Sequence, residues 1–307
     1  MINSIIEGSS LYIKQILSFG GFKVTELKKG IYEQLLTAFQ SMANHDVVMI
    51  PELINLVRGT KGLLSLDDTD NPSYGLKHVA IKFKKLSTGG YHKGYKILLF
   101  LWCTKYWRIP IGFALYHKES KSINELAREG LSLLRNTYEL IPETVLADGA
   151  FFTNETAKRL TDYGWPFVMR FSKSRTLSKA PIRKLIPRGY GEAKGTIANG
   201  TKLKVIRRKS RFFACNRMMW EVKEILKLYT LRWKVEEIFR VLKTCLGLHR
   251  CQQHTMDAQA IYVLMCLVLT ACAERLKAGS IYEYLQQSFS AKLDIEELLK
   301  QGLTPIC

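Results

Sequence analysis

Apolar residues recur at helical spacing near both ends of the chain. The segment "VTELKKGIYEQLLTAFQSMA" (24–43) shows this spacing directly after the chain break that Gly20 and Gly21 predict. Residues 1–60 are therefore predicted to be a helical N-terminal region. The longest apolar run, at 260–273, is too short for a typical membrane span and predicts a buried helix that covers a sheet.

Between these ends, short apolar runs alternate with helical patterns. The run 63–67 ends in an acid, and segments rich in Val, Ile, Phe and Tyr between 77 and 116 predict strands. The later elements are predicted as helix 122–138, strand 144–148, helix 154–164 closed by a glycine, and strand 165–171. The order β-β-β-α-β-α-β, followed later by a long helix, indicates an α/β fold.

The segment "YTLRWKVEEIFRVLK" (229–243) is predicted to form one helix with a narrow polar stripe. At about 100° per residue, Tyr229, Arg232, Glu236 and Lys243 fall within about 60° of one another. The stripe follows the rim of the apolar face, whereas Glu237 lies about 100° away from Glu236. One interpretation is a solvated edge with an Arg232–Glu236 ion pair; the other is a functional surface.

The net charge of the chain indicates the kind of partner that it binds. Lys and Arg number 46 against 27 Asp and Glu, which gives a net charge of +19 and favours a polyanion such as nucleic acid. From 170 to 211, fourteen Lys and Arg face one acid, Glu192, in a stretch with Gly, Pro and β-like alternation. We predict a small β-rich basic insertion at about 172–217 that binds phosphates, with Arg207, Arg208 and Lys209 as candidate contacts. The alternative is a solvated basic loop.

Cysteine usage and the N-terminus bear on the compartment. Seven scattered cysteines with no CxxC pair favour a reducing cytoplasm, and residues 1–21 do not form a convincing signal peptide. The spacing of "CLGLHRCQQH" (245–254) is tighter than structural zinc patterns and favours a turn with incidental thiols. The protein is expected to be cytoplasmic, without a membrane partner, and nucleoid-associated when it acts.

Three carboxylates are candidates for a metal site. Asp67 and Asp148 each end a predicted strand, where the sites of α/β proteins are built, and Glu236 lies on the stripe of the predicted helix. Carboxylates that lie close together repel, and Mg²⁺, which prefers oxygen ligands, would relieve that repulsion. Asp68 is the rival of Asp67, which is preferred because it leaves Thr69 two residues on.

These residues resemble a known family. Tyr229-x2-Arg232-x3-Glu236-x6-Lys243 is similar to the signature of the IS4-like DDE transposases of bacterial insertion sequences. "VLADGAFF" resembles the segment of their second aspartate, and Asp67-Asp68-Thr69 that of their first. The resemblance covers roughly 60–275. It implies a ribonuclease-H-like mixed sheet flanked by helices, with a β-rich insertion between the second aspartate and the glutamate.

The resemblance also implies the chemistry and the partners. Asp67, Asp148 and Glu236 would hold two Mg²⁺ or Mn²⁺ ions, and the enzyme would cleave DNA at the element ends and join them to target DNA. Tyr229, Arg232 and Lys243 would bind DNA, in a homodimer that brings two ends together. Trp233 would either stack on a base or pack inside the fold.

Three parts of the chain are expected on this basis. Residues 1–60 would be a helical region and a candidate DNA-binding part, 61–275 the catalytic core with its insertion, and 276–307 a helical tail. Two alternatives stay open: a non-catalytic DNA-binding remnant, which the short N-terminal region favours, and a nuclease with the same core.

Overall fold

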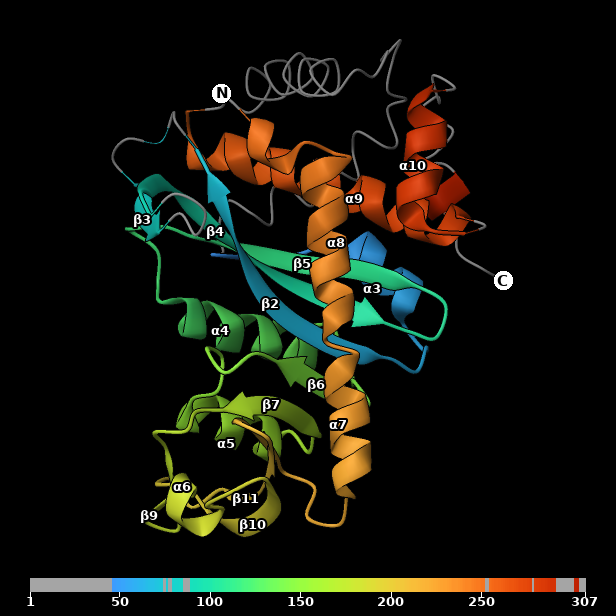
Figure 1. Cartoon of the computed structure of the whole chain (residues 1–307). Coiled ribbons are helices and arrows are strands. Elements are labelled where there is room, and N and C mark those ends of the chain that lie inside the picture. The colour runs from blue at the N-terminus through green and yellow to red at the C-terminus, as the bar shows by residue number, and fades with distance from the viewer. Residues whose placement is uncertain are drawn as a thin grey trace.

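A mixed sheet of ten strands forms the centre of the protein (Figure 1). The computed structural model describes residues 46–290 except 74, 75, 77, 78, 85–88, 252, 253 and 278, together with residues 301–303. The strands of this sheet are β1 Val47–Met49, β2 Leu63–Pro72, β3 Ile81–Lys84, β4 Tyr91–Cys103, β5 Arg108–Tyr116, β6 Thr144–Ala147, β7 Phe167–Phe171, β10 Tyr190–Thr196, β11 Lys202–Arg208 and β12 Arg211–Cys215. β8 Thr176–Leu177 and β9 Ala180–Pro181 pair separately.

The strand order confirms the expected α/β fold with a mixed, ribonuclease-H-like sheet. The order is β1-β5-β4-β2-β6-β7-β12-β11-β10, with β3 beside β4. β2, β4 and β5 are antiparallel neighbours, whereas β2, β6 and β7 run parallel. β12 pairs antiparallel with β7, so the predicted insertion extends the central sheet through β12, β11 and β10.

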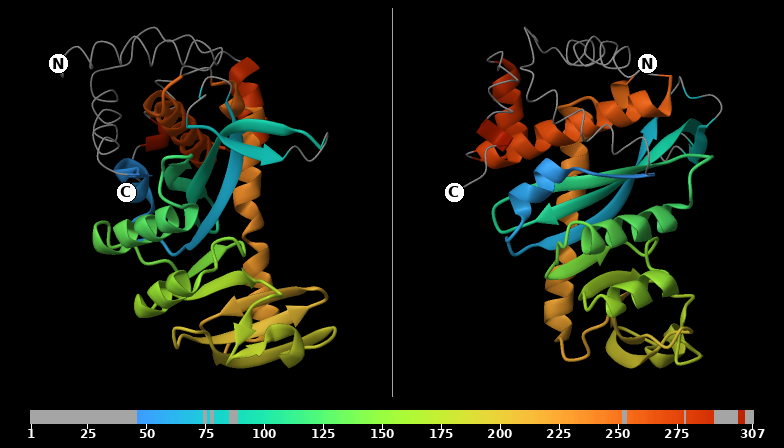
Figure 2. Two further views of the ribbon diagram at one scale, coloured as in Figure 1. Left: turned by 90° about the vertical axis from the view of Figure 1, so that its left-hand side faces the viewer. Right: turned by 180° about the vertical axis from the view of Figure 1, so that it is seen from behind.

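Helices cover both faces of this sheet (Figure 2). In chain order they are α3 Pro51–Val57, α4 Ile123–Asn136, α5 Asn154–Asp162, α6 Ile182–Leu185, α7 Val222–Thr230, α8 Trp233–Thr244, α9 Met256–Leu276 and α10 Ile281–Ser290. α4 and α5 lie on one face, and α7 and α8 form a column along the other (Figures 1 and 2). A short 3₁₀ turn, Leu248–Arg250, follows α8.

Local signals explain how the helix α4 is placed. Ser122 caps its N-terminus, and Ser122 and Glu125 form a reciprocal capping box. Gly130 then lets α4 approach the sheet closely, because a Cβ there would lie 2.1 Å from Cζ of Phe100. The apolar face of α4 therefore packs against β4, which pairs with β2, the strand that carries Asp67 and Asp68.

The structure bears on three sequence predictions about the two ends of the chain. Residues 1–45 lie outside the described residues, but 46–60 contain the strand β1 beside β5 as well as the helix α3, so a purely helical region is wrong there. α9 contains the predicted apolar helix. Its window Gln259–Leu276 is long and apolar enough to cross a membrane, yet 89% of it is buried inside the fold. The tail contains α10, while 291–300 lie outside the description.

The predicted single helix at 229–243 is two helices. α7 ends at Thr230 and α8 begins at Trp233, and the joint between them is held by i→i−3 hydrogen bonds. Leu231 N donates to Leu228 O at 3.0 Å, and Arg232 N donates to Tyr229 O at 3.1 Å. Helical periodicity carries across such a tightened turn, so the sequence pattern did not reveal the break.

Candidate active site

The strand β2 presents its two neighbouring aspartates to opposite faces of the sheet. Asp67 forms an ion pair with Arg232 from the α7–α8 joint, whereas Asp68 pairs with Lys96 of β4 at 2.6 Å. Successive side chains of a strand alternate between faces, which separates these partners. β2 continues to Pro72, so Asp67 lies within the strand rather than at its predicted end.

Two residues of the polar stripe, Arg232 and Tyr229, contact the other two carboxylates. Arg232 uses its second terminal nitrogen to pair with Glu236, in the first turn of α8. Tyr229 donates its hydroxyl to Asp148 at 3.4 Å, directly after β6. The guanidinium of Arg232 also lies 5.6 Å from the centre of the Tyr229 ring. The structure therefore gathers Asp67, Asp148 and Glu236 around Arg232 and Tyr229.

Burial dominates the electrostatics of this cluster. It raises the pKa of Asp67 to about 6; Arg232 and the amide of Asp68 oppose this, while the charges of Asp68 and Asp148 add to it. Burial likewise raises the pKa of Tyr229 to about 12, so its phenol stays protonated. For Arg232, burial lowers the pKa, but Asp67, Tyr229 and Glu236 raise it by more. A partly buried anion with a raised pKa is typical of functional carboxylates.

The last residue of the stripe contacts the same strand. Lys243 in the last turn of α8 donates to the hydroxyl of Thr69 at 2.6 Å, two residues after Asp67. Burial lowers the pKa of Lys243, and the charge of Asp70 partly offsets this. α8 thus lies along β2, with Glu236 at one end and Lys243 at the other.

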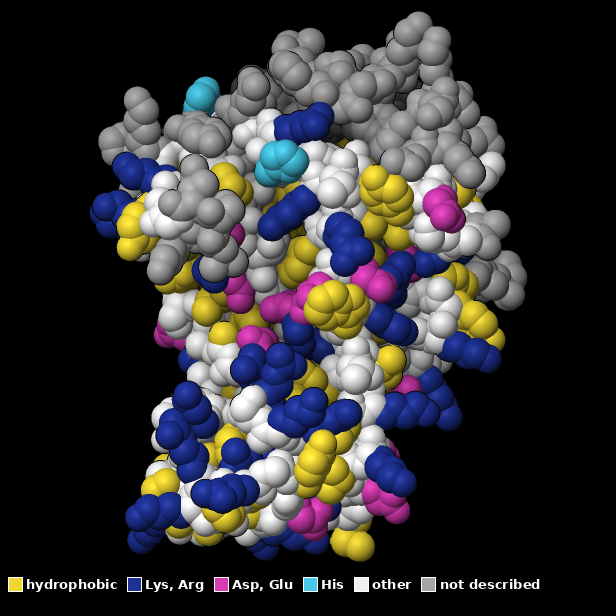
Figure 3. All heavy atoms as spheres, viewed as in Figure 1, with side chains coloured by type: hydrophobic (Ala, Val, Ile, Leu, Met, Phe, Trp, Pro, Cys, Tyr) yellow, Lys and Arg dark blue, Asp and Glu magenta, His cyan; other side chains and the backbone are white. Residues whose placement is uncertain are grey.

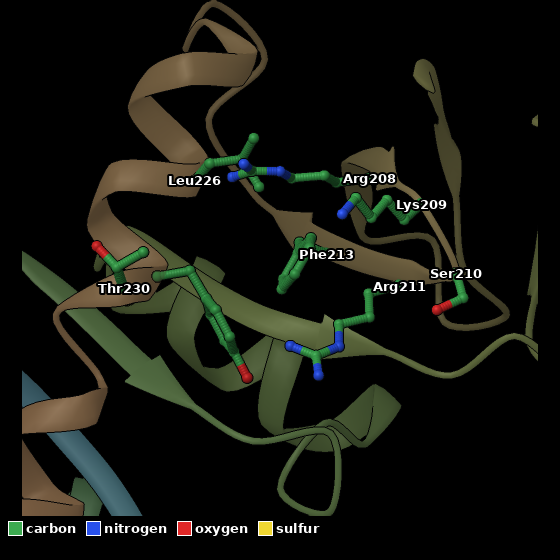
Figure 4. A pocket seen from close by; sticks show the side chains of 8 residues that line it. Arg208, Lys209, Ser210, Arg211, Phe213, Leu226 and Thr230 are labelled. Atoms are coloured by element: carbon green, nitrogen blue, oxygen red, sulfur yellow. The ribbon is translucent and has the colours of Figure 1, made fainter. Parts of the chain in front are cut away.

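A basic groove leads away from the carboxylates. Two adjoining cavities of about 620 and 460 Å³ share Arg211, Phe213, Tyr229 and Thr230 in their walls, and the larger one includes Asp148. Arg208 and Arg211 extend from the β11–β12 hairpin toward α7 (Figure 4). We call this the basic groove and define it by Arg170, Arg208, Lys209, Arg211, Phe213, Tyr229, Thr230, Arg232 and Trp233. Lys and Arg side chains gather on this face below a group of acids (Figure 3).

Strand alternation separates two of the predicted basic contacts, Arg207 and Arg208, whereas Lys209 lies in the turn between β11 and β12. Arg208 and Lys209 line the groove. Arg207 points to the other face, where it donates to the carbonyls of Ile186 and Lys209 and lies over the ring of Phe212. Charge counting along the stretch did not separate these roles, because only the pairing of β11 with β12 assigns the faces.

Other predictions about this region are corrected or extended. Lys204 is buried and pairs with Glu192 at 2.7 Å, so the stretch is not fourteen free cations. Trp233 is 53% exposed, so the interpretation of a packed tryptophan is wrong. Arg170 and Arg211 were missed as groove residues, although β alternation places them on the face of Phe213.

The donor set suits a hard divalent cation in its chemistry. Asp67, Asp148 and Glu236 offer carboxylate oxygens, which Mg²⁺ and Mn²⁺ prefer. Among the described residues, no three acidic, His or Cys side chains lie together as a ready metal group. Arg232 instead supplies the positive charge between Asp67 and Glu236, and its buried Nε has no hydrogen-bond acceptor within the described part of the chain.

The fold and the three carboxylates are those expected of a DDE-type transposase domain, and sequence comparison identifies the family. The family described as "Transposase DDE domain" matches residues 58–272. The chain belongs to this transposase family, as the Tyr-Arg-Glu-Lys spacing indicated. Enzymes of this kind generally use divalent metal ions. No curated protein sequence matches the chain.

Solved structures with similarity to the chain are distant. A piggyBac transposase synaptic complex with hairpin DNA has a TM-score of 0.48 at 11% identity, over 81% of this chain and 55% of that one. Human ENDOV has a TM-score of 0.28 at 11% identity (91% and 98% covered), and a Drosophila P element transposase strand transfer complex 0.20 at 13% (90% and 56%). The chain spans about half the length of the piggyBac chain that it matches.

Proposed function

We propose that this protein cleaves DNA at the ends of a transposable element and transfers the new 3′ ends into target DNA. The carrying observation is that Asp67 and Glu236 pair with Arg232 while Asp148 accepts from Tyr229, and that Asp148 and Arg232 also line the basic groove. A groove with several arginines can follow a phosphate backbone. We propose double-stranded DNA as the partner and a homodimer as the working form, because two ends must be joined.

Each residue of the site has a proposed role. Asp67, Asp148 and Glu236 would hold two Mg²⁺ or Mn²⁺ ions, which supply an activated nucleophile and stabilise the leaving 3′ oxygen when bound. Arg232, whose two terminal nitrogens pair with Asp67 and Glu236, is proposed to bind a phosphate next to these carboxylates. Tyr229 orients Asp148 through its hydroxyl.

Residues further along the groove would bind and align the strand. Arg170, Arg208, Lys209 and Arg211 provide positive charge for phosphates. The exposed ring of Trp233 at the start of α8 provides a stacking surface for a base. Arg207 and Lys243 stay proposed DNA contacts, although both are already bound to other parts of the fold.

Replacement of Glu236 by Gln tests the proposal. The amide keeps the size of the side chain but loses the charge that a hard cation needs, so we expect nicking to slow by at least about 10³-fold, or about 4 kcal/mol. The assay is nicking, with Mg²⁺ present, of a duplex that carries the inverted repeats flanking the gene. DNA affinity in Ca²⁺ should change less than about threefold.

Glu224→Gln is the matched control, because Glu224 is exposed on α7 and loses the same charge. We expect it to nick at the unmodified rate. Equal losses in the two variants would refute the role of Glu236. An unmodified protein that binds the repeats without nicking them would favour the DNA-binding remnant, and nicking without strand transfer would favour a nuclease.

A further inference from the structure

The joint between α7 and α8 is a tightened turn, beyond which the apolar side chains of α8 are buried in the fold. Four backbone hydrogen bonds at this joint span three residues instead of four: 228–231, 229–232, 231–234 and 232–235, with donor–acceptor distances of 3.0 to 3.2 Å. Tightened turns of this kind within a helical stretch often mark hinges. Because Glu236 lies one turn after the joint, the position of its carboxylate depends on whatever holds α8.

Polar contacts hold α8 at both ends. Lys243 binds Thr69 of β2 in the last turn. Near the joint, Lys234 donates to the carbonyl of Thr104 at 3.2 Å, and Glu237 accepts from Nη1 of Arg108 in β5. Glu237 lies off the polar stripe, and this position did not reveal that its carboxylate contacts Arg108.

Arg108 is itself held rigidly by a buried acid. Its backbone NH and its Nε each donate to Glu274 of α9 at 3.0 Å. Glu274 is 1% exposed, and Lys277 also binds it, at 2.7 Å. Because its backbone NH and its Nε are already bound, the Arg108 side chain loses little further conformational freedom when it also binds Glu237.

We propose that Arg108 is a positioning residue, which sets the rotation of α8 through Glu237 and so places the carboxylate of Glu236 beside Asp67 and Asp148. This inference rests on the proposed function of those carboxylates. Arg108 and Glu237 do not take part in the cluster of Asp67, Asp148, Tyr229 and Arg232, and they act on it only through the backbone of α8.

The geometry of a helix gives the size of the effect. Glu236 lies four residues from Arg232, or about 6 Å along the helix axis. A tilt of α8 by about 10° at the joint therefore moves Glu236 by about 1 Å. Metal ligands tolerate about 0.2 Å, and a misplacement of about 1 Å in an active site can cost about 100-fold in rate. Loss of the Glu237–Arg108 contact is therefore expected to slow nicking by about 10- to 100-fold.

The test compares Glu237→Ala, which removes the acceptor, with Glu237→Gln, which keeps an oxygen for Arg108. Arg108 is left unchanged, because its loss would strand the buried Glu274 and disturb the fold. Glu224→Ala on α7 is the control for lost charge. Three quantities are measured on the full chain: amide hydrogen exchange of residues 233–244, affinity for the flanking-repeat duplex, and nicking of that duplex with Mg²⁺.

Support requires faster exchange in 233–244 and slower nicking for Glu237→Ala alone, with DNA affinity within about twofold in every variant. Unchanged exchange in Glu237→Ala would overturn the proposal whatever the nicking rate. Faster exchange with undiminished nicking would overturn it as well, because α8 would then move without consequence for the site. If the unmodified protein does not nick, the proposed function fails, while hydrogen exchange still decides whether Arg108 holds α8.

Discussion

The stability advantage of Asp67→Asn over the unmodified chain is expected to grow as the pH rises, even though the substitution removes a proposed metal ligand. Burial raises the pKa of Asp67 to about 6 from an ordinary value of 3.8, although Arg232 lies beside it. The folded state thus binds the proton of Asp67 more tightly than the unfolded state does. Ionised Asp67 therefore costs stability at neutral pH, and Asn, which carries no charge, avoids that cost.

The size of the effect follows from the two pKa values. Below pH 3.8 the carboxyl is protonated in both states and costs nothing. Between 3.8 and 6 the unfolded state loses the proton first, and stability falls by about 1.4 kcal/mol per pH unit. Above 6 the cost levels off at about 3 kcal/mol. Between pH 5 and pH 7.5 it should grow by about 1.4 kcal/mol, or about 2 °C in the melting temperature of a chain of this size.

The assay is thermal unfolding of Asp67→Asn and the unmodified protein at pH 5 and 7.5 with a metal chelator present. The difference in melting temperature, variant minus unmodified, should increase by about 2 °C from pH 5 to pH 7.5. Glu224→Gln is the control, because an exposed carboxylate carries no burial cost. A difference that shrinks with pH, or that changes equally in the control, would refute the claim that burial outweighs Arg232 at Asp67.

Two further predictions concern the groove and the fold. The combined variant Arg208→Ala, Lys209→Ala and Arg211→Ala should reduce the slope of log affinity for duplex DNA against log salt by about 2 to 3 units, at about 0.9 per lost phosphate contact. Arg207→Ala should change that slope less, because carbonyl oxygens already hold its guanidinium; the reverse order would place DNA on the other face. Gly130→Ala should lower the unfolding free energy by about 1 to 3 kcal/mol in urea titration, because its Cβ would collide with Phe100. An unchanged value would mean that the Phe100 ring can move aside.

The sequence predicted the frame of the fold because the frame depends on local patterns. Runs of apolar residues marked the strands that became β2, β6 and β7, and helical periodicity marked α4 and α5. The same periodicity placed Tyr229, Arg232, Glu236 and Lys243 on one side, and the structure brings all four to the face of β2 and β6. The break at the α7–α8 joint escaped prediction, because a 3₁₀ turn changes the hydrogen bonds more than the side-chain pattern.

Only the tertiary structure decided which of two adjacent residues in a strand faces the site. The sequence favoured Asp67 over Asp68 only through the position of Thr69 and did not distinguish Arg207 from Arg208, whereas strand register assigns each to a face. The contact of Arg108 with Glu237 joins residues 129 positions apart, and that of Arg232 with Asp67 joins residues 165 apart. The charge of the chain and the types of its reactive groups are local properties, which a sequence states directly. The partner of each group depends on how distant elements pack, and that is a property of the folded chain only.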